Sequence, residues 1–586
     1  MTADVVPPEL LEIPSPHERR RLDRDLCAGL LDRLLRRLAR QEALCRRVLG
    51  HLARHFLAKR AHQRLGFVRL DDFARERLGL SGRELQELAR VAQRLEALPA
   101  LARAFAQGAL SWSHLRLLVS VATPDTEAAW LARARGESVR ALEAAIAVTR
   151  GVPPDPDERA VDGESPGRFH LRCPRRVRRL WHHATELASR MSGARLPAWR
   201  AAEAIAAEGL ASQAADAVAQ SDPPQAPTRR DAAPPLPPGL WEAIAEALPE
   251  PVDRLTLLAD TANPYQLDAR LRAAVRAVQR IDFQTGRLLR LVAQLRLHRA
   301  FGVRALPDYV RERLGCSLRK ARALLALDRR LAELPALAAV YRDGALSFAR
   351  ALVLLPVVHP DTEAAWVERA QQVTVRRLAD LVEWALEVEE PGHPLAPPPA
   401  EGTLVLPPVQ MCARGADAQV RFSGPASVVA LLWTAIRAFT PQGAPPWQGF
   451  ERLLLHVVAE WERGPRHRDP IFERDGWRCA VPACTARASL HDHHVVYRSR
   501  GGDHARNNRV AICAAHHLNG IHRFRIRVEG VAPHDLTWQL GVRRGRPPLM
   551  VTHGDRYLQV PLSELGAGCA SSDGCAALLP RDAWWR

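Results

Sequence analysis

The sequence GFVRLDDFARERLGLSGRELQELARVAQRLEALPALARAFAQGALSWSHLRLLVSVATPDTEAAW, residues 66–130, returns in altered form as GVRALPDYVRERLGCSLRKARALLALDRRLAELPALAAVYRDGALSFARALVLLPVVHPDTEAAW, residues 302–366. The segments RERLG, LPAL, GALS and PDTEAAW all recur at an offset of 236 residues, which indicates an internal duplication without insertions. In both copies leucine and alanine recur every three or four residues with arginine between them, the period of amphipathic helices. The duplicated part is therefore predicted to be mainly α.

The repeat extends beyond these two segments. RFHLRCPRRVRRLW, residues 168–181, resembles VRFSGPASVVALLW, residues 420–433, at an offset of 252. Each copy is thus predicted to contain a helical domain, a short extended segment and further helices, while a Pro-rich linker that cannot hold a helix separates the copies. The predicted ranges are a disordered N-terminus at 1–20, a first helical unit at 21–215, the linker at 216–250, a second helical unit at 251–464, a Cys/His-rich module at 465–535, and strands with a tail at 536–586.

The charge of the chain favours a polyanionic partner. The net charge is +18, and 81 of the 83 basic residues are arginine. Between Arg463 and Met550 there are 16 arginines against 7 acidic residues, so half of the net charge lies in this part of the chain. We therefore expect nucleic acid, and DNA first, as the partner.

Targeting and membrane signals are missing from the sequence. The N-terminal MTADVVPPELLEIPSPHERR has neither a basic n-region nor an apolar h-region. No apolar run approaches the roughly 18 residues that a membrane helix needs. We expect a cytoplasmic protein without a membrane partner, and the sequence contains no indication of the oligomeric state.

The most distinctive stretch is CAVPACTARASLHDHHVVYRSRGGDHARNNRVAICAAHHLNGIH, residues 479–522, with three Cys, seven His and three Asn. Two cysteines precede a double histidine, and a Cys-x-x-His pair follows it. Thiolates and imidazole in two short pairs suit a closed tetrahedral zinc site. The predicted zinc ligands are Cys479, Cys484, Cys513 and His516.

The remaining residues of this stretch resemble those of the HNH endonucleases, also called His-Me finger or ββα-metal nucleases. LHDHHVVYRSRGGD resembles the first strand, double histidine and Gly-Gly turn of that family, and NNRVAICAAHH resembles its Asn, second strand and helix entry. The resemblance covers about residues 468–528. It implies a small α+β module with the ββα-metal fold behind the mainly α repeats, and it implies divalent-metal-dependent hydrolysis of DNA phosphodiester bonds.

The resemblance also implies a role for individual residues. His494 would be the general base, and Asn508 would hold its ring. His493 and His517 would bind a catalytic Mg²⁺ or Mn²⁺. Arginines near the double histidine would contact the DNA backbone: Arg498, Arg500 and Arg509.

Elementary chemistry is consistent with these roles. Phosphodiester hydrolysis needs an activated water and a cation on the developing charge, and a neutral imidazole near its working pKa accepts the water proton. Neighbouring residues on a strand point to opposite faces, which separates His493 from His494 and puts Asp492 on the side of His494. Asp492 and His491 are the next candidates if the assignment of the base fails.

His522 departs from the family pattern. It follows His517 by five residues rather than four, and on an ideal α-helix five residues turn the chain about 140° away from the starting face. Only a local unwinding at Gly520 would bring His522 back. We treat it as either a further metal ligand or a phosphate contact.

Each helical copy also resembles the helix-turn-helix of chromosome-partition proteins, through LGLS before one helix and G-x-L-S before a later one. In the second copy Arg319, Lys320 and Arg322 would then face DNA. The alternative is a bundle that only packs.

The leading function is a zinc-containing, divalent-metal-dependent HNH endonuclease acting on DNA. One alternative is a zinc-containing protein that binds DNA without cutting it, and another is a nuclease that acts on RNA.

Overall fold

The computed structural model describes residues 16–149, 166–192, 196–211, 252–388, 397–399, 418–463, 469–487 and 489–558. The predicted linker at 216–250 and the end of the tail lie outside these residues. Helix α1 already begins at Pro16, inside the range that was predicted to be disordered up to residue 20.

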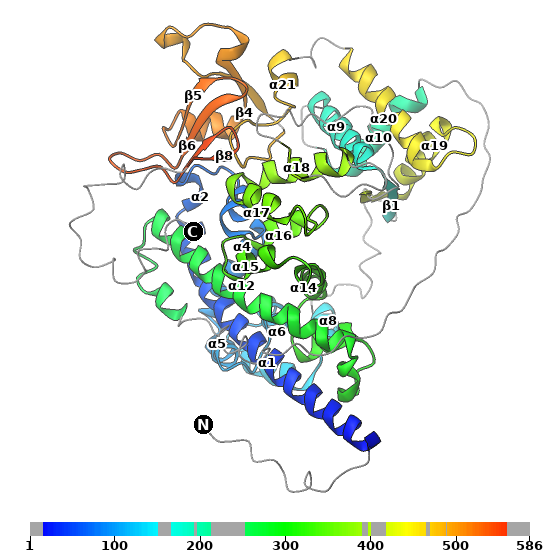
Figure 1. Cartoon of the computed structure of the whole chain (residues 1–586), viewed down its shortest axis with the longest axis vertical. Coiled ribbons are helices and arrows are strands. Elements are labelled where there is room, and N and C mark those ends of the chain that lie inside the picture. The colour runs from blue at the N-terminus through cyan, green and yellow to red at the C-terminus, as the bar shows by residue number, and fades with distance from the viewer. Residues whose placement is uncertain are drawn as a thin grey trace.

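The first copy is almost entirely helical (Figure 1). Its elements are α1 (Pro16–Ala58), α2 (Ala61–Arg64), α3 (Leu70–Phe73), the π-helical turn η2 (Ala74–Leu78), α4 (Gly82–Leu95), α5 (Pro99–Ala106), α6 (Trp112–Leu118), α7 (Glu127–Gly136), α8 (Val139–Thr149), β1 (Pro166–Cys173), α9 (Arg175–Met191) and α10 (Ala198–Ala211).

The second copy repeats this order, and α14 to α17 begin and end 236 residues after α4 to α7. Its elements are η4 (Val252–Thr256), α12 (Pro264–Gln294), η5 (Leu297–Phe301), α13 (Leu306–Asp308), the π-helical turn η6 (Tyr309–Arg313), α14 (Leu318–Leu331), α15 (Pro335–Arg342), α16 (Phe348–Leu354), α17 (Glu363–Gln372), α18 (Val375–Val388), β2 (Ala418–Pro425), α19 (Ala426–Phe439) and α20 (Pro446–Glu462).

The motifs shared by the two copies cap helices and form hydrogen bonds between helices. Ser81 caps α4 by accepting a hydrogen bond from the backbone N–H of Glu84, and Ser317 caps α14 in the same way. In PDTEAAW the glutamate is buried, and its carboxylate accepts from a backbone N–H at the start of an earlier helix. Glu127 bonds Leu101 N and Glu363 bonds Leu337 N, both at 2.7 Å.

The two copies are joined through equivalent elements, which relates them by an approximate two-fold axis. Strands β1 and β2 pair antiparallel over their full length, with Phe169 opposite Phe422. Helix α10 packs on α19 and α9 packs on α20, so the helices that follow each strand lie against those of the other copy. The long helices α1 and α12 pack side by side in the same manner (Figure 1).

Ion pairs across this axis occur in matched pairs. Arg77 of the first copy donates two hydrogen bonds to Asp268 of the second, at 3.1 and 2.7 Å. Arg313 of the second copy donates two to Asp32 of the first, at 2.9 and 2.7 Å. Because Arg313 and Asp268 lie 236 residues after Arg77 and Asp32, each pair is the image of the other.

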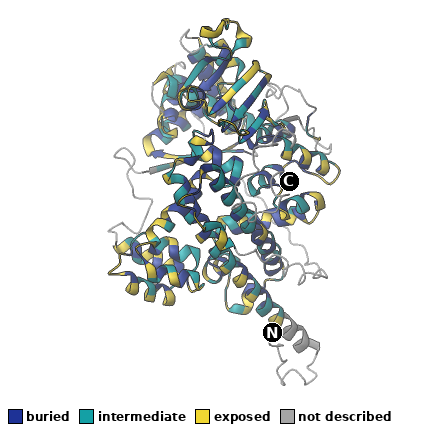
Figure 2. Ribbon diagram, turned by 90° about the vertical axis from the view of Figure 1, so that its left-hand side faces the viewer, coloured by how far each residue is buried: buried dark blue, intermediate teal, exposed yellow. Residues whose placement is uncertain are grey.

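The hydrophobic cores are shared between the predicted units. Phe169 and Trp181 of the first copy lie in one core with Phe422 and Phe450 of the second. Another core joins residues of α1 and α4 to α12 and to the C-terminal module, where Val481 and Trp538 belong to it. The predicted boundaries at 215 and 251 therefore separate segments of sequence, but they do not separate cores. Figure 2 shows buried residues continuing from the helices into the C-terminal sheet.

The C-terminal region is a small α+β structure above the helices (Figure 1). Its elements are α21 (Pro470–Arg474), β3 (Leu490–His494), the short 3₁₀ turns η8 (Arg498–Arg500) and η9 (Arg506–Asn508), β4 (Arg509–Cys513), α22 (Ala514–His516), the π-helical turn η10 (His517–Ile521), β5 (Ile526–Val531), β6 (Asp535–Leu540), β7 (Met550–His553) and β8 (Arg556–Tyr557). Strands β5 to β8 form an antiparallel sheet in chain order. The predicted fold class, mainly α with a small α+β region, is confirmed.

The basic residues at the start of α14 differ in exposure. Lys320, which was predicted to face DNA, is enclosed instead, and its ammonium group lies 2.7 Å from Glu42 and 2.6 Å from Asp282. Arg319 and Arg322 are exposed.

Among the described residues, no helix has both the length and the apolar character that crossing a bilayer requires.

Candidate functional site: a thiolate and imidazole centre on a strand pair

The site is built on the antiparallel pair β3 and β4. Leu490 lies opposite Cys513, His493 opposite Val510 and His494 opposite Arg509. The chain then turns through α22 and η10 and brings the last histidines back to β3. This order of two strands and a helical turn is the one that the resemblance implied.

The four predicted zinc ligands converge in the structure. The ligand atoms of Cys479, Cys484, Cys513 and His516 all lie within 4.8 Å of one another, and all four residues are buried. His516 Nδ1 is 3.6 Å from Cys479 Sγ and 3.3 Å from Cys513 Sγ. Zinc bonds of about 2.3 Å to sulfur and 2.0 Å to nitrogen at a tetrahedral angle would separate these atoms by about 3.5 Å. The cluster therefore fits a metal ion such as zinc.

An arginine of the second helical copy holds the loop that carries the first two thiols. Arg376, on α18, is buried and donates hydrogen bonds to the carbonyl oxygens of Cys479 and Cys484 at 2.8 Å and of Val481 at 3.2 Å. Its other guanidinium nitrogen is paired with Asp555 at the end of the sheet. Sequence reasoning missed Arg376, because no local pattern distinguishes it from its counterpart Arg140 in the first copy.

Arg376→Met should lower the free energy of unfolding by about 3–5 kcal/mol, because it leaves Asp555 and three loop carbonyls without their partner. The matched control is Arg140→Met, at the exposed equivalent position, which should change stability by less than about 0.5 kcal/mol. Urea denaturation of both variants checks this. Equal stability losses in the two variants would contradict the role of Arg376.

A second cluster consists of imidazoles on the other side of the strand pair. His493 is buried, and its Nε2 is without a hydrogen-bond partner in the described structure. Its ring centre lies 4.9 Å from that of His517 and 6.3 Å from that of His522. Burial, followed by the neighbouring His517 and His522, lowers the pKa of His493 to about 3. The ring is therefore neutral and keeps a lone pair for a cation.

His522 does return to the cluster, and the backbone explains how. Residues His517–Ile521 form a π-helical turn, in which His522 N–H donates to the carbonyl of His517, five residues earlier, at 3.1 Å. The wider turn absorbs the extra residue that the ideal α-helix could not. His522 Nε2 consequently lies 3.2 Å from His517 Nε2. The predicted departure of His522 from this face holds only for α-helical geometry.

His491 contacts the imidazole cluster through His517. Its Nδ1 lies 2.9 Å from His517 Nδ1, within hydrogen-bonding distance. One nitrogen of His517 is thus occupied by His491 while the other faces His522. Histidines that bind metals commonly use their second nitrogen in this way, which fixes ring and tautomer.

These donors fit some divalent ions better than others. His493, His517 and His522 offer only nitrogen, which suits zinc and the neighbouring transition metals. Mg²⁺ prefers oxygen ligands. The donor set therefore gives no support to the predicted Mg²⁺ or Mn²⁺.

His494 lies at the end of β3 and is partly exposed. Its Nε2 lies 3.0 Å from Nδ1 of His504, a residue that the sequence analysis did not single out. Desolvation, then His504 and Arg498, lower the pKa of His494, which favours the neutral form that a base requires. The only sequence signal for His504 was its position just after the Gly-Gly turn.

The contact predicted for Asn508 needs correction. Its side-chain oxygen accepts from Val496 N at 2.8 Å, and its amide donates to the carbonyls of Val496 at 3.1 Å and Asp503 at 2.8 Å. Both ends of the amide are thus bonded to backbone, not to the ring of His494. Asn508 closes the loop between the strands, and this loop carries His504.

The Gly-Gly turn in that loop has a steric cause. Gly501 adopts a φ of 84°, in the left-handed region that glycine favours. A Cβ on Gly502 would lie 1.9 Å from the carbonyl oxygen of Val496 and 3.0 Å from Nδ2 of Asn508. The two glycines therefore allow the tight closure by Asn508.

The three predicted DNA-contacting arginines differ in availability. Arg498 and Arg500 are exposed on η8, and Arg500 lies over the ring of Tyr497 at 5.4 Å. Arg509 is largely buried and forms an ion pair with Asp492 across the strands. The ion pair directs Arg509 toward Asp492 rather than toward DNA, and it engages one carboxylate oxygen of Asp492.

Comparison with known proteins adds no identification: no family model matches the chain, and no similar curated protein or solved structure was found.

Proposed function

We propose that this chain is a metal-dependent endonuclease that hydrolyses phosphodiester bonds in DNA. The observation that carries the proposal is the arrangement along β3. His493, buried and neutral, faces His517 and His522 with a free nitrogen, while the next residue, His494, is accessible to water. Binding DNA alone would need neither a buried cluster of neutral imidazoles nor an adjacent accessible one.

Each residue has a defined part in the proposed reaction. A bound divalent ion would supply Lewis acidity at the phosphate and at the leaving oxygen. His493, His517 and His522 would hold it, and His491 orients the ring of His517. His494 takes the proton from the attacking water with the nitrogen that does not face His504.

The Cys₃His cluster has a separate task in the proposal. Four ligands with no open position are typical of a structural zinc rather than a catalytic one. Zinc at Cys479, Cys484, Cys513 and His516 would tie the loop that precedes β3 to the end of β4 and to α22. The imidazole cluster would then take its ion independently.

His517→Ala should raise the concentration of divalent ion needed for half-maximal cleavage by at least about 100-fold and lower the maximum rate. His491→Ala is the informative comparison, because it removes only the orienting partner and should raise the requirement by about tenfold. Titration of metal-stripped protein with Mn²⁺, Co²⁺, Ni²⁺ and Mg²⁺ measures both effects. An unchanged ion requirement in His517→Ala would remove this residue from the proposed ligand set.

The second candidate function is a zinc-containing protein that binds DNA without cutting it. The exposed Arg498 and Arg500 are compatible with this function. RNA in place of DNA is compatible with the same residues. Cleavage assays with both polymers separate these three functions.

A further inference from the structure

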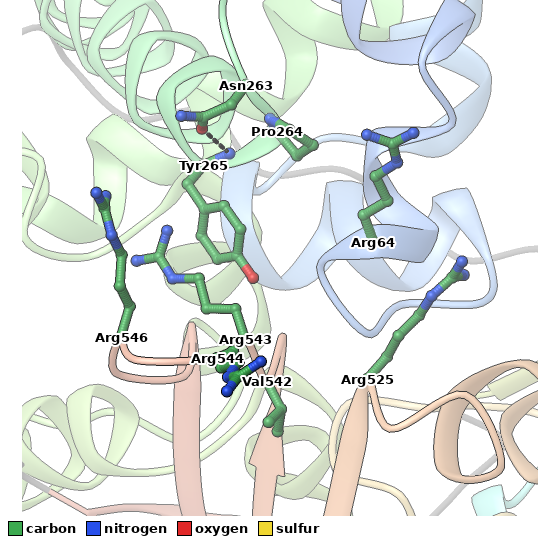
Figure 3. Close-up of a pocket in the computed structure, with 9 residues that line it drawn as sticks. All are labelled: Arg64, Asn263, Pro264, Tyr265, Arg525, Val542, Arg543, Arg544 and Arg546. Atoms are coloured by element: carbon green, nitrogen blue, oxygen red, sulfur yellow. Dashed lines mark hydrogen bonds between the residues drawn. The ribbon is translucent and has the colours of Figure 1, made fainter.

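Five arginines outside the strand pair line a single cavity of about 620 Å³ (Figure 3). They come from parts of the chain that are far apart in sequence. The first copy contributes one from α2, the segment before β5 contributes one, and the loop between β6 and β7 contributes three, while the start of α12 forms the remaining wall. The five are Arg64, Arg525, Arg543, Arg544 and Arg546.

The described residues that line this cavity carry an excess of positive charge. In the described part of the chain, no carboxylate pairs with any of the five guanidinium groups, and none lines the cavity. Their nearest polar contacts are weak: Arg525 donates to the carbonyl of Gln63, and Arg543 to that of Pro547, both at 3.4 Å. Desolvation, together with the charges of Arg523 and Arg64, lowers the pKa of Arg525. The cavity therefore favours an anion.

Guanidinium groups dominate the lining of this cavity, and the other polar groups are partly engaged within the protein. The Tyr265 ring is covered by Arg543, whose guanidinium carbon lies 3.7 Å from the ring centre. The Tyr265 hydroxyl donates to the carbonyl of Gly541 at 2.8 Å. Asn263 caps α12 by accepting from the N–H groups of Tyr265 and Gln266. One face of the Tyr265 ring, its hydroxyl group and the side-chain oxygen of Asn263 are thus engaged within the protein.

The cavity is close to the proposed catalytic centre along the chain. Arg525 follows His522 by three residues, so their Cα atoms are at most about 11 Å apart. Arg523, which is exposed, lies between them. Duplex DNA carries one phosphate charge per about 1.7 Å of its axis, so a duplex held at the histidines presents several phosphates within this distance.

We propose that the arginine cavity, lined by Arg64, Arg525, Arg543, Arg544 and Arg546, binds the sugar-phosphate backbone of duplex DNA beside the cleaved bond. This inference rests on the proposed function, because it assumes that the DNA is bound at the histidine cluster and extends from there over the cavity. The cavity contributes affinity mainly through contacts between its guanidinium groups and phosphate oxygens. The first helical copy thereby takes part in substrate binding through Arg64.

The test replaces the three exposed arginines and leaves Arg525 and Arg543 in place, because Arg543 packs on Tyr265. The variant is Arg64→Gln, Arg544→Gln, Arg546→Gln. A control with the same loss of charge is Arg90→Gln, Arg133→Gln, Arg342→Gln, at exposed positions on the helical copies. Fluorescence anisotropy with a labelled duplex of about 30 base pairs, without added divalent ion, measures affinity between about 50 and 200 mM salt.

The cavity variant should bind the duplex at least about tenfold more weakly at the lower salt concentration. Its slope of log affinity against log salt should be shallower by about 0.9 for each phosphate that the variant no longer neutralises. The control variant should change neither quantity by a comparable amount. Equal slopes of log affinity against log salt for the cavity variant and the wild type would overturn the inference. A cavity variant that binds the duplex as the wild type does, but no longer binds anionic lipid vesicles, would also overturn it.

Failure of this inference is distinguishable from failure of the proposed function. Wild-type protein that binds the duplex through the cavity but cuts no DNA would refute the nuclease and leave the cavity assignment intact. Wild-type protein that cuts DNA, with an unchanged salt slope in the cavity variant, would refute the cavity assignment alone.

Discussion

His494→Ala is expected to lower the rate of DNA cleavage by about 10²- to 10⁴-fold, the usual cost of losing a general base. DNA affinity should stay within a few-fold of wild type, because the exposed arginines that are proposed to contact the DNA backbone are unchanged. Zinc content should not change, since His494 lies outside the Cys₃His cluster. Single-turnover cleavage at saturating metal measures the rate.

The control for this variant is His553→Ala, an exposed histidine on β7 of the C-terminal sheet, which should cut at the wild-type rate. His504→Ala should show an intermediate loss, because it frees the ring of His494 without deleting it. Cleavage by His494→Ala at the wild-type rate would show that another group takes the proton. His491 then becomes the first alternative, since Asp492 is held by Arg509.

Cys513→Ser should have the largest effect on stability. The variant lacks one of the four predicted metal ligands. In small zinc modules, metal binding contributes on the order of 10 kcal/mol to folding. We expect loss of stoichiometric zinc and rapid proteolysis between residues 469 and 558. We also expect a lower melting temperature of the helical copies, because Cys513 and Val481 share a core with Leu52 and Phe56 of α1.

Cys45→Ser provides the comparison for this variant. Cys45 is equally buried but lies in a different core, away from the four ligands. It should keep its zinc and lose only the modest stability of a single buried side-chain change. A Cys513→Ser protein with wild-type zinc would contradict the metal assignment. A Cys513→Ser protein whose helices melt at the wild-type temperature would contradict the shared core.

The features that could be predicted from the sequence are those whose residues lie close together along the chain. The helical copies follow from a period of three to four residues and a constant offset, and the Cys₃His set follows from two close pairs of ligands joined by a strand pair. In each case the relevant geometry is local, so the residue types and their spacing largely determine it.

Long-range relations could not be predicted in this way. Nothing in the two copies indicates that β1 pairs with β2, or that Arg77 reaches Asp268, because such contacts depend on how packed elements meet. The same holds for Arg376, which reaches the loop of Cys479 and Cys484 from another part of the chain. The return of His522 stayed open because it depends on whether the turn after His517 widens. The backbone contacts of Asn508 were missed because they depend on how a loop closes.

The most direct test of the central claim is incubation of purified wild-type protein with supercoiled plasmid, with and without divalent ions. The account predicts nicked or linear DNA only when a suitable ion is present, and cleavage by His494→Ala that is at least about 100-fold slower. Plasmid that is bound but stays supercoiled with every ion tested would contradict the account and leave a DNA-binding protein in its place.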